Sequence, residues 1–392
     1  MTWVHWMLLG ALVGVETGLA QPGGAPAVSL VRRARADGSG TADFVRVPEG
    51  PLFFSRMVVA TEVTAAVVRQ AEEALDLLVR DVVKAGGSGQ TVVRLQGYLV
   101  EERDYEAVAA VVASRFAAYP PAVTWTTTPL AVPGARVAFE AMAAVAPSMS
   151  GDGASPEGGA ILPPGPKVFI SGQAERGDGL TDSVRRTMES LHRTVAGLGL
   201  APSDVVQVKA FIHPFSGHAA ARAAIEAGFA GGRLPAIVMM EWVATLPAEI
   251  ELVVAGRGLK TPPGEGVTFV TLPGKPSSPR FSHVAIVSAG TPLIVLGGID
   301  AGPGEQAYRE QWKRIFEQLG GTLFEAGSSF RHLVKATYFL EETPERGLLN
   351  EIRAVYYDPT RPPAASAVGV KSVGQPGRSF HIDLIAVPRP AP

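Results

Sequence analysis

Three acidic side chains, Glu140, Glu251 and Asp383, recur in the last strand-like segment of three stretches of the chain. These segments alternate in polarity, as in Phe380–Ile385 (FHIDLI), so one face of each strand is expected to be buried and the other to line something polar. A carboxylate on such a face can take part in acid–base chemistry, or it can serve contacts inside the protein. The sequence leaves both roles open.

The composition excludes several kinds of catalytic centre. The 392-residue chain has no cysteine, which rules out thiol nucleophiles, disulfides, iron–sulfur clusters and cysteine-containing zinc sites. It has no His-Glu-x-x-His and no Gly-x-Ser-x-Gly motif. His283 and His381 could form a polar cleft or a weak metal site, but two scattered histidines without a spaced carboxylate are not a metal motif. We therefore predict no metal and no cofactor.

The charge balance and the N-terminus limit partners and location. With 35 Lys+Arg against 37 Asp+Glu the chain lacks the basic field that nucleic acid requires, and no apolar run is long enough to span a membrane. Met7–Val15 followed by small residues resembles a signal peptide cleaved after Ala20, although the cationic start is missing. Export to the periplasm and a cytoplasmic location both stay open. Residues 21–42 are expected to form a flexible leader.

Internal similarity indicates a threefold repeat. Aligning Tyr98 with Phe211 and Phe339 gives offsets of 113 and 128 residues. A proline opens a later strand in each stretch, and these prolines give offsets of 114 and 128; they are Pro121, Pro235 and Pro363. The three acids named above give offsets of 111 and 132. Independent anchors that agree this closely are the signature of a repeat architecture.

Each unit is predicted to run strand–strand–helix–strand–helix–strand–strand. The apolar periodicity predicts first helices at 64–85, 180–198 and 305–326, and second helices at 105–119, 217–231 and 345–356. The expected organisation is a candidate signal peptide (1–20), a leader (21–42), units at 43–147, 166–256 and 267–389, and linkers at 148–165 and 257–266.

Motifs in the second and third units resemble one known family. The second unit carries Val168–Gln173 (VFISGQ), Leu234–Ala236 (LPA) and Glu249–Glu251 (EIE), and the third carries Arg280–His283 (RFSH) and Arg361–Ser366 (RPPAAS). These motifs resemble the Rid family of YjgF-like imine and enamine deaminases, also described as L-PSP endoribonucleases. The resemblance covers residues 43–388 as three divergent tandem copies.

The resemblance implies an α+β, chorismate-mutase-like fold. Rid proteins are typically homotrimers whose sheets form a central barrel, with helices outside and ligand clefts at the subunit interfaces. Three copies in one chain would then form an intramolecular pseudo-trimer with a central β-barrel. Such a chain is expected to be monomeric, with its clefts between neighbouring copies.

The family's substrate clamp is missing from this sequence. In the deaminases an arginine after Pro-Ala binds the substrate carboxylate, and that position falls on Val123, Ile237 and Ala365 here. A neutral side chain cannot replace a bidentate guanidinium. Arg136, two residues before Ala138 on the same strand face, could point into a cleft in its place, or it could be a solvated arginine at a strand end.

Other family positions are partly retained. The acid that positions water falls on Glu249 in the second copy, but on Ala138 in the first and His381 in the third. The turn that offers a hydroxyl and backbone donors survives in the second copy as Ser171, Gly172 and Gln173. The family's helix asparagine corresponds to Asn350, and the aromatic that closes the cleft corresponds to Phe281.

These residues lead to two hypotheses of function. In the first, a divergent hydrolase acts on an imine, an enamine or a related small metabolite, with Glu249 positioning water and Ser171 in an oxyanion site. The predicted ligand-binding residues are Gly172, Gln173, Ile237, Asn350, Phe281, His381 and Arg136. In the second, a non-catalytic binding or scaffold protein has kept the fold and lost the clamp. Either way the expected partner is a small molecule rather than nucleic acid or a membrane.

Overall fold

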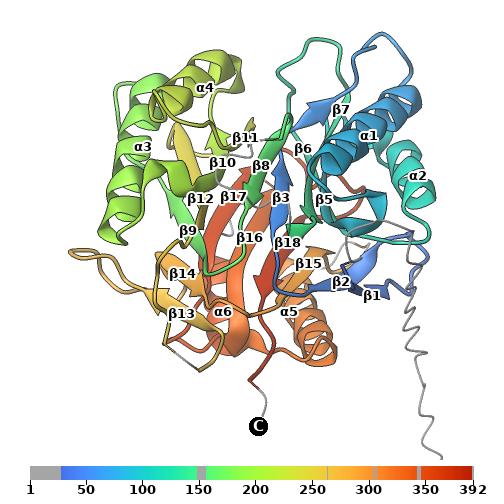
Figure 1. Cartoon of the computed structure of the whole chain (residues 1–392). Coiled ribbons are helices and arrows are strands. Elements are labelled where there is room, and N and C mark those ends of the chain that lie inside the picture. The colour runs from blue at the N-terminus through green and yellow to red at the C-terminus, as the bar shows by residue number, and fades with distance from the viewer. Residues whose placement is uncertain are drawn as a thin grey trace, which may run out of the picture.

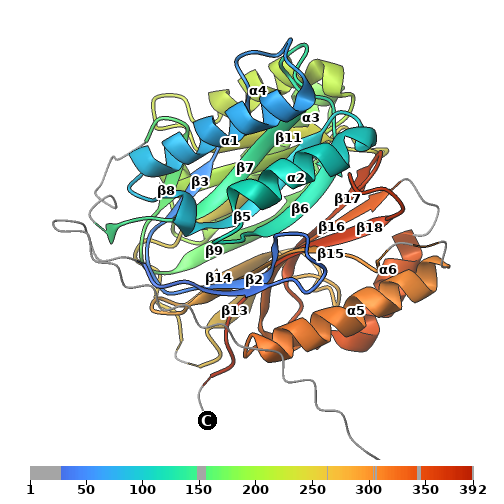
Figure 2. The same ribbon diagram turned by 90° about the vertical axis from the view of Figure 1, so that its right-hand side faces the viewer.

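The computed structural model describes residues 28–390 except 148–155, 263, 303, 305–306 and 342–345. Its sheets lie inside and its helices lie outside (Figures 1 and 2), so the predicted α+β class is confirmed. The candidate signal peptide lies outside the described residues. Within them, no helix combines the length and the apolar character needed to cross a membrane.

The strands form three sheets. The first sheet has the order β6-β5-β7-β3-β8, with β4 on β7, and contains β3 (Leu52–Ser55), β4 (Val58–Val59), β5 (Val92–Leu99), β6 (Ala122–Thr127), β7 (Val137–Ala144) and β8 (Gly159–Leu162). The second has the order β11-β10-β12-β9-β14-β13, with β9 (Lys167–Gln173), β10 (Val205–Ile212), β11 (Ala236–Glu241), β12 (Ala248–Ala255), β13 (Val267–Val270) and β14 (Val284–Val287). The third has the order β1-β2-β15-β18-β16-β17, with β1 (Val31–Ala34), β2 (Ala42–Val47), β15 (Leu293–Ile299), β16 (Leu333–Glu341), β17 (Ala364–Val370) and β18 (Phe380–Ala386).

Two helices cover the outer face of each sheet (Figure 2). They are α1 (Val67–Lys84) and α2 (Tyr105–Arg115) on the first sheet, α3 (Leu180–Gly197) and α4 (His218–Ala227) on the second, and α5 (Tyr308–Glu325) and α6 (Arg346–Tyr356) on the third. The apolar spacing explains the packing, since Trp312, Ile315, Phe316 and Leu319 of α5 are all fully buried on one helix face. In each sheet the second helix joins two parallel strands, as α2 joins β5 to β6.

The first strands of each segment pair with a sheet other than the one that the rest of the segment forms. The hairpin β1–β2 pairs with β15 in the third sheet, β8 pairs with β3 in the first, and β14 pairs with β9 in the second. The short connections 48–51, 163–166 and 288–292 therefore carry the chain from one sheet to the next. Each sheet is completed by strands from another part of the sequence, which joins all three into one body.

Two predictions need correction at this point. The flexible leader predicted at 21–42 contains a strand, β1, and the first residue of another, because residues 31–34 add to the edge of the third sheet. The predicted central barrel is not closed in the part of the chain that the structure describes, because the strands form three separate hydrogen-bonded sheets. Their inner faces pack against one another through apolar side chains instead.

Strand exchange between segments can be tested by crosslinking. Val45 of β2 and Val295 of β15 are direct partners in the antiparallel register, and the natural chain has no cysteine to interfere. In a Val45→Cys/Val295→Cys protein we expect an intrachain disulfide on mild oxidation, detected by mass spectrometry of the peptides. Crosslinking only between chains, or none at all, would contradict this pairing. Val45→Cys alone is the control.

Candidate functional site

The second and third sheets meet where the end of β9 lies against β17. The main-chain N–H of Ala365 donates to the Ser171 hydroxyl oxygen (2.8 Å), and that hydroxyl donates to the Ser282 carbonyl (2.6 Å). The N–H of Gly172 donates to the Ser366 hydroxyl (3.2 Å). We call this region the second–third junction and define it by Ser171, Gly172, Glu249, Phe281–His283 and Ala365–Ser366.

Ser171 lies at the junction as a link between strands. Its side chain is buried, and its hydroxyl both accepts and donates a hydrogen bond to main-chain groups of the third segment. A hydroxyl engaged in this way holds β9 to β17 and has no further proton to offer a ligand. Ser171 therefore has no free O–H group for the oxyanion site that the sequence predicts.

Glu249 lies directly over the turn after Ser171. A Cβ atom added to Gly172 would overlap the Glu249 carboxylate, so the glycine is what lets this acid approach the main chain. Glu249 is half-buried on β12 and points to the same face as Glu251, two residues further on. The acid at this junction is thus partly accessible, which is what a group that handles water and protons requires.

Aromatic residues flank the same junction. The ring of Phe281 packs edge-on against His283 with centroids 5.6 Å apart, and the carbonyl of His283 accepts a hydrogen bond from the Ser171 N–H (3.0 Å). Burial, together with Lys275, lowers the pKa of His283, so its imidazole is neutral near pH 7. Gln173 turns away, because its amide donates to Thr194 on α3 (3.0 Å).

No arginine occupies the three clamp positions. Val123 and Ile237 are 5% and 4% exposed in the helix-side cores of the first and second sheets. Ala365 is partly buried against the helix-side core of the third sheet, and its N–H lies at the junction. Arg136, the proposed substitute, forms a two-point ion pair with the buried Asp104, including Nε to Oδ2 at 3.1 Å. Its guanidinium is therefore bound within the first segment.

Two further predicted residues lie apart from the junction. Asn350 on α6 accepts a hydrogen bond from Arg353, whose guanidinium carbon lies 5.4 Å from the centre of the Tyr338 ring. His381 on β18 is completely buried in the third sheet, where neither ring nitrogen makes a hydrogen bond of good geometry and the main chain of Trp125 is the polar group within reach. Burial lowers the pKa of His381 to about 4 despite the opposing effect of Asp300, so the imidazole stays neutral.

His381 makes folding sensitive to acid. Its pKa of about 4 in the folded protein lies below the ordinary value of 6.5, so between these values the unfolded chain binds the proton more strongly. Stability should therefore fall as the pH drops from 6.5 to 4, by roughly 3 kcal/mol from this residue. The unfolding free energy of His381→Leu, measured with urea, should decrease clearly less between pH 6.5 and 4 than that of the unmodified chain. An equal decrease in both proteins would mean that His381 is protonated equally in the folded and unfolded states.

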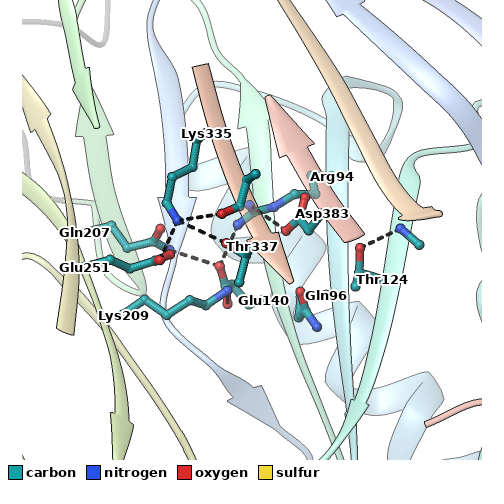
Figure 3. Close-up of polar contacts among 12 residues, drawn as sticks. Arg94, Gln96, Thr124, Glu140, Gln207, Lys209, Glu251, Lys335, Thr337 and Asp383 are labelled. Atoms are coloured by element: carbon teal, nitrogen blue, oxygen red, sulfur yellow. Dashed lines mark hydrogen bonds and ion pairs between the residues drawn. The ribbon is translucent and has the colours of Figure 1, made fainter. Parts of the chain in front are cut away.

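Sequence reasoning left the role of the three recurring acids open, and the structure shows internal contacts. Figure 3 shows their side chains meeting on the inner faces of the three sheets. Glu140 accepts from Arg94 (2.8 Å), Tyr98 (2.5 Å) and Gln207 (3.0 Å), and it pairs with Lys209 (3.0 Å). The remaining pairs are Arg94 with Asp383 (3.1 Å) and Lys335 with Glu251 (2.6 Å). We call these six charged residues the axial network.

The cations of the axial network keep Glu140 ionised despite its burial. Burial acts to raise the pKa of Glu140, but Lys209 and Arg94 hold it below its ordinary value. Burial and the Glu140 charge raise the pKa of the Tyr98 phenol, so it remains a hydrogen-bond donor. Glu140 is completely buried, which excludes it from direct contact with substrate. In the described residues, no group of three or more His, Asp or Glu side chains is arranged to hold a metal ion.

Sequence comparisons find relatives of part of the chain. A family model described as Endoribonuclease L-PSP matches residues 275–388. The protein DfrA of Myxococcus xanthus is 30% identical over 112 residues, which are 27% of this chain and 84% of that protein. A RutC family protein of Synechocystis is 36% identical over 84 residues, or 21% of this chain and 64% of that protein. One from Pyrococcus abyssi is 30% identical over 101 residues, or 24% of this chain and 77% of that protein.

Solved structures also match about one segment at a time. A YjgF family protein from Neisseria meningitidis has 26% identity and a TM-score of 0.24, covering 32% of this chain and 97% of its own. A Rid family protein from Yersinia pestis has 20% identity and a TM-score of 0.29, covering 31% of this chain and 98% of its own. The family assignment rests on the sequence relatives that this chain covers over more than two thirds of their length: the chain belongs to the Rid family, which includes the YjgF and RutC proteins.

Proposed function

We propose that the chain is a divergent Rid-type hydrolase that acts at the second–third junction on a small imine or enamine without a carboxylate. The observation that carries this proposal is the position of Glu249, a half-buried carboxylate over the Gly172 turn. In the reaction, a water oxygen attacks the imine carbon, and Glu249 takes a proton from this water and passes it to the nitrogen, which gives the carbinolamine. Glu249 then takes the hydroxyl proton of the carbinolamine and passes it to the nitrogen, so that the C–N bond breaks, the carbonyl group forms and ammonia leaves.

The preference for a substrate without a carboxylate follows from the missing cation. Val123, Ile237 and Ala365 provide no charge at the clamp positions, and Arg136 is paired with Asp104. A substrate carboxylate brought next to Glu249 would meet a like charge and would lack the guanidinium that binds it in the deaminases, which costs several kcal/mol in a partly buried site. A neutral imine or enamine avoids this penalty.

The proposed assembly is a pseudo-trimer of three divergent Rid copies in one chain. It is supported by the equal strand order β6-β5-β7-β3, β11-β10-β12-β9 and β17-β16-β18-β15 in the three sheets. Exchange of first strands between segments would favour a monomeric chain, because each sheet obtains its edge strands internally. The proposed partner is a small metabolite, with neither nucleic acid nor a membrane involved.

Returning an arginine to the junction tests the proposed substrate class. Ala365 is less buried than Ile237 and its N–H contacts Ser171, so a long side chain is better tolerated at position 365. We expect Ala365→Arg to raise kcat/KM for 2-iminopropanoate relative to a neutral imine by at least tenfold, measured by ammonia release. Ala365→Leu is the matched control for size. If the unmodified chain already prefers 2-iminopropanoate, the proposed substrate class is wrong.

A further inference from the structure

The interior between the three sheets is layered. At one end lies an apolar layer to which all three sheets contribute, including Val93, Val206 and Val334. At the other end lies a second apolar layer built around Tyr98, Phe211 and Phe339. The axial network lies between them, because Arg94 precedes Tyr98 on β5 and Lys335 precedes Phe339 on β16. A charged layer is thus enclosed by apolar side chains.

The ion pairs of the axial network run in one direction around the three sheets. Arg94 of the first sheet reaches Asp383 of the third, and Lys335 of the third reaches Glu251 of the second. Lys209 of the second sheet reaches Glu140 of the first, which closes the cycle. The three positive and three negative charges cancel. Each sheet provides one cation and one acid, and each of these groups pairs with a group of another sheet.

Two buried polar atoms in this network have no hydrogen-bond partner within the protein. They are the Nε–H of Arg94, which is a donor, and the Oδ1 of Asp383, which is an acceptor. Asp383 and Arg94 are 5% and 8% exposed, and their other atoms bond to each other at 3.1 Å. A buried donor or acceptor that keeps no partner destabilises the folded protein.

Both side chains line the same partly enclosed cavity of about 20 Å³ between the sheets. Its other polar walls are Gln207, Lys209, Glu251, Lys335 and Thr337, and its remaining walls are apolar. A cavity needs only about 10–15 Å³ to hold one water molecule, provided that the water has two or more polar partners. This cavity, which we call the chamber, is large enough and has more than two polar side chains in its walls.

We propose that this chamber is a binding site for one internal water molecule that completes the ring of ion pairs. The water accepts from Arg94 Nε–H and donates to Asp383 Oδ1, which satisfies both atoms at once. A halide could accept from the arginine but has no proton to give Asp383, and it would face two carboxylates in the wall. A metal cation would face the charges of Arg94, Lys209 and Lys335. Only a neutral molecule that both donates and accepts suits the site.

A crystal structure at about 1.5 Å resolution, with a second crystal soaked in bromide, tests the site directly. We expect one density peak within hydrogen-bonding distance of both atoms and no anomalous bromide signal there. An empty chamber or a bromide peak would overturn the proposal. In solution, oxygen-17 magnetic relaxation dispersion should count one long-lived water fewer in Asp383→Leu than in the unmodified chain. Asp383→Asn, which keeps an acceptor oxygen and covers the case in which the leucine variant does not fold, should retain the full count.

Discussion

Replacing Glu140 with leucine should destabilise the protein by about 3–5 kcal/mol. Glu140 is completely buried and interacts with Arg94, Tyr98, Gln207 and Lys209, so its removal leaves the buried Lys209 without its ion-pair partner and leaves Arg94 with Asp383 alone. An uncompensated buried charge is far more costly than a missing surface ion pair. The change should appear as a large decrease in the urea concentration at the midpoint of unfolding.

The control for this variant is Glu157→Leu. Glu157 forms an exposed ion pair with Lys84 (2.8 Å), and its loss should leave the urea concentration at the midpoint of unfolding nearly unchanged. Equal effects of the two substitutions would show that the axial network does not hold the sheets together. Glu140→Gln should fall between them, because the amide oxygen can still accept hydrogen bonds while the charge is lost.

Replacing Glu249 with glutamine should lower kcat for imine hydrolysis by about 10²–10⁴-fold. The amide keeps the size of the side chain over Gly172 but cannot accept a proton from the attacking water. Because Glu249 is half-buried, the unfolding free energy should change little, which separates a catalytic loss from a folding defect. Ammonia release and urea unfolding of the same preparation provide the two readouts.

A second carboxylate in the same segment provides the control for Glu249. Glu226 pairs with Arg222 on the surface of α4 (2.8 Å), and Glu226→Gln should leave the rate of hydrolysis unchanged. If Glu249→Gln retains the unmodified rate, the acid at the second–third junction takes no part in the reaction. The proposal would then have to move to another site or be abandoned for ligand binding without catalysis.

Periodicity predicted the elements of this protein well, because it reflects local physics. Helices predicted at 180–198 and 345–356 are observed as α3 (Leu180–Gly197) and α6 (Arg346–Tyr356). The pairing of strands was not predictable in the same way. Alternation fixes which face of β14 is buried, but β14 could satisfy that pattern against β9 or against β15 equally well. Only the three-dimensional arrangement distinguishes these partners.

The candidate site shows the same division between local and long-range information. The motifs around Ser171 and Glu249 are short, and the structure brings Gly172 and Glu249 into contact at one junction. Arg136 was a candidate because of its strand position, yet Asp104 on a neighbouring turn binds it. Asp383 and Glu251 pair with cations of another sheet, and Glu140 pairs with Lys209 of another sheet as well as with Arg94 of its own. No spacing within one segment could reveal the pairs between sheets.

Ammonia release from a neutral imine generated in situ is the most direct test of the proposed hydrolase activity. The unmodified chain should release ammonia well above the rate in buffer, and faster from the neutral imine than from 2-iminopropanoate at the same concentration. That result would support a Rid-type hydrolase that has changed its substrate class. A rate equal to buffer for both imines would contradict the account and indicate a binding protein without this activity.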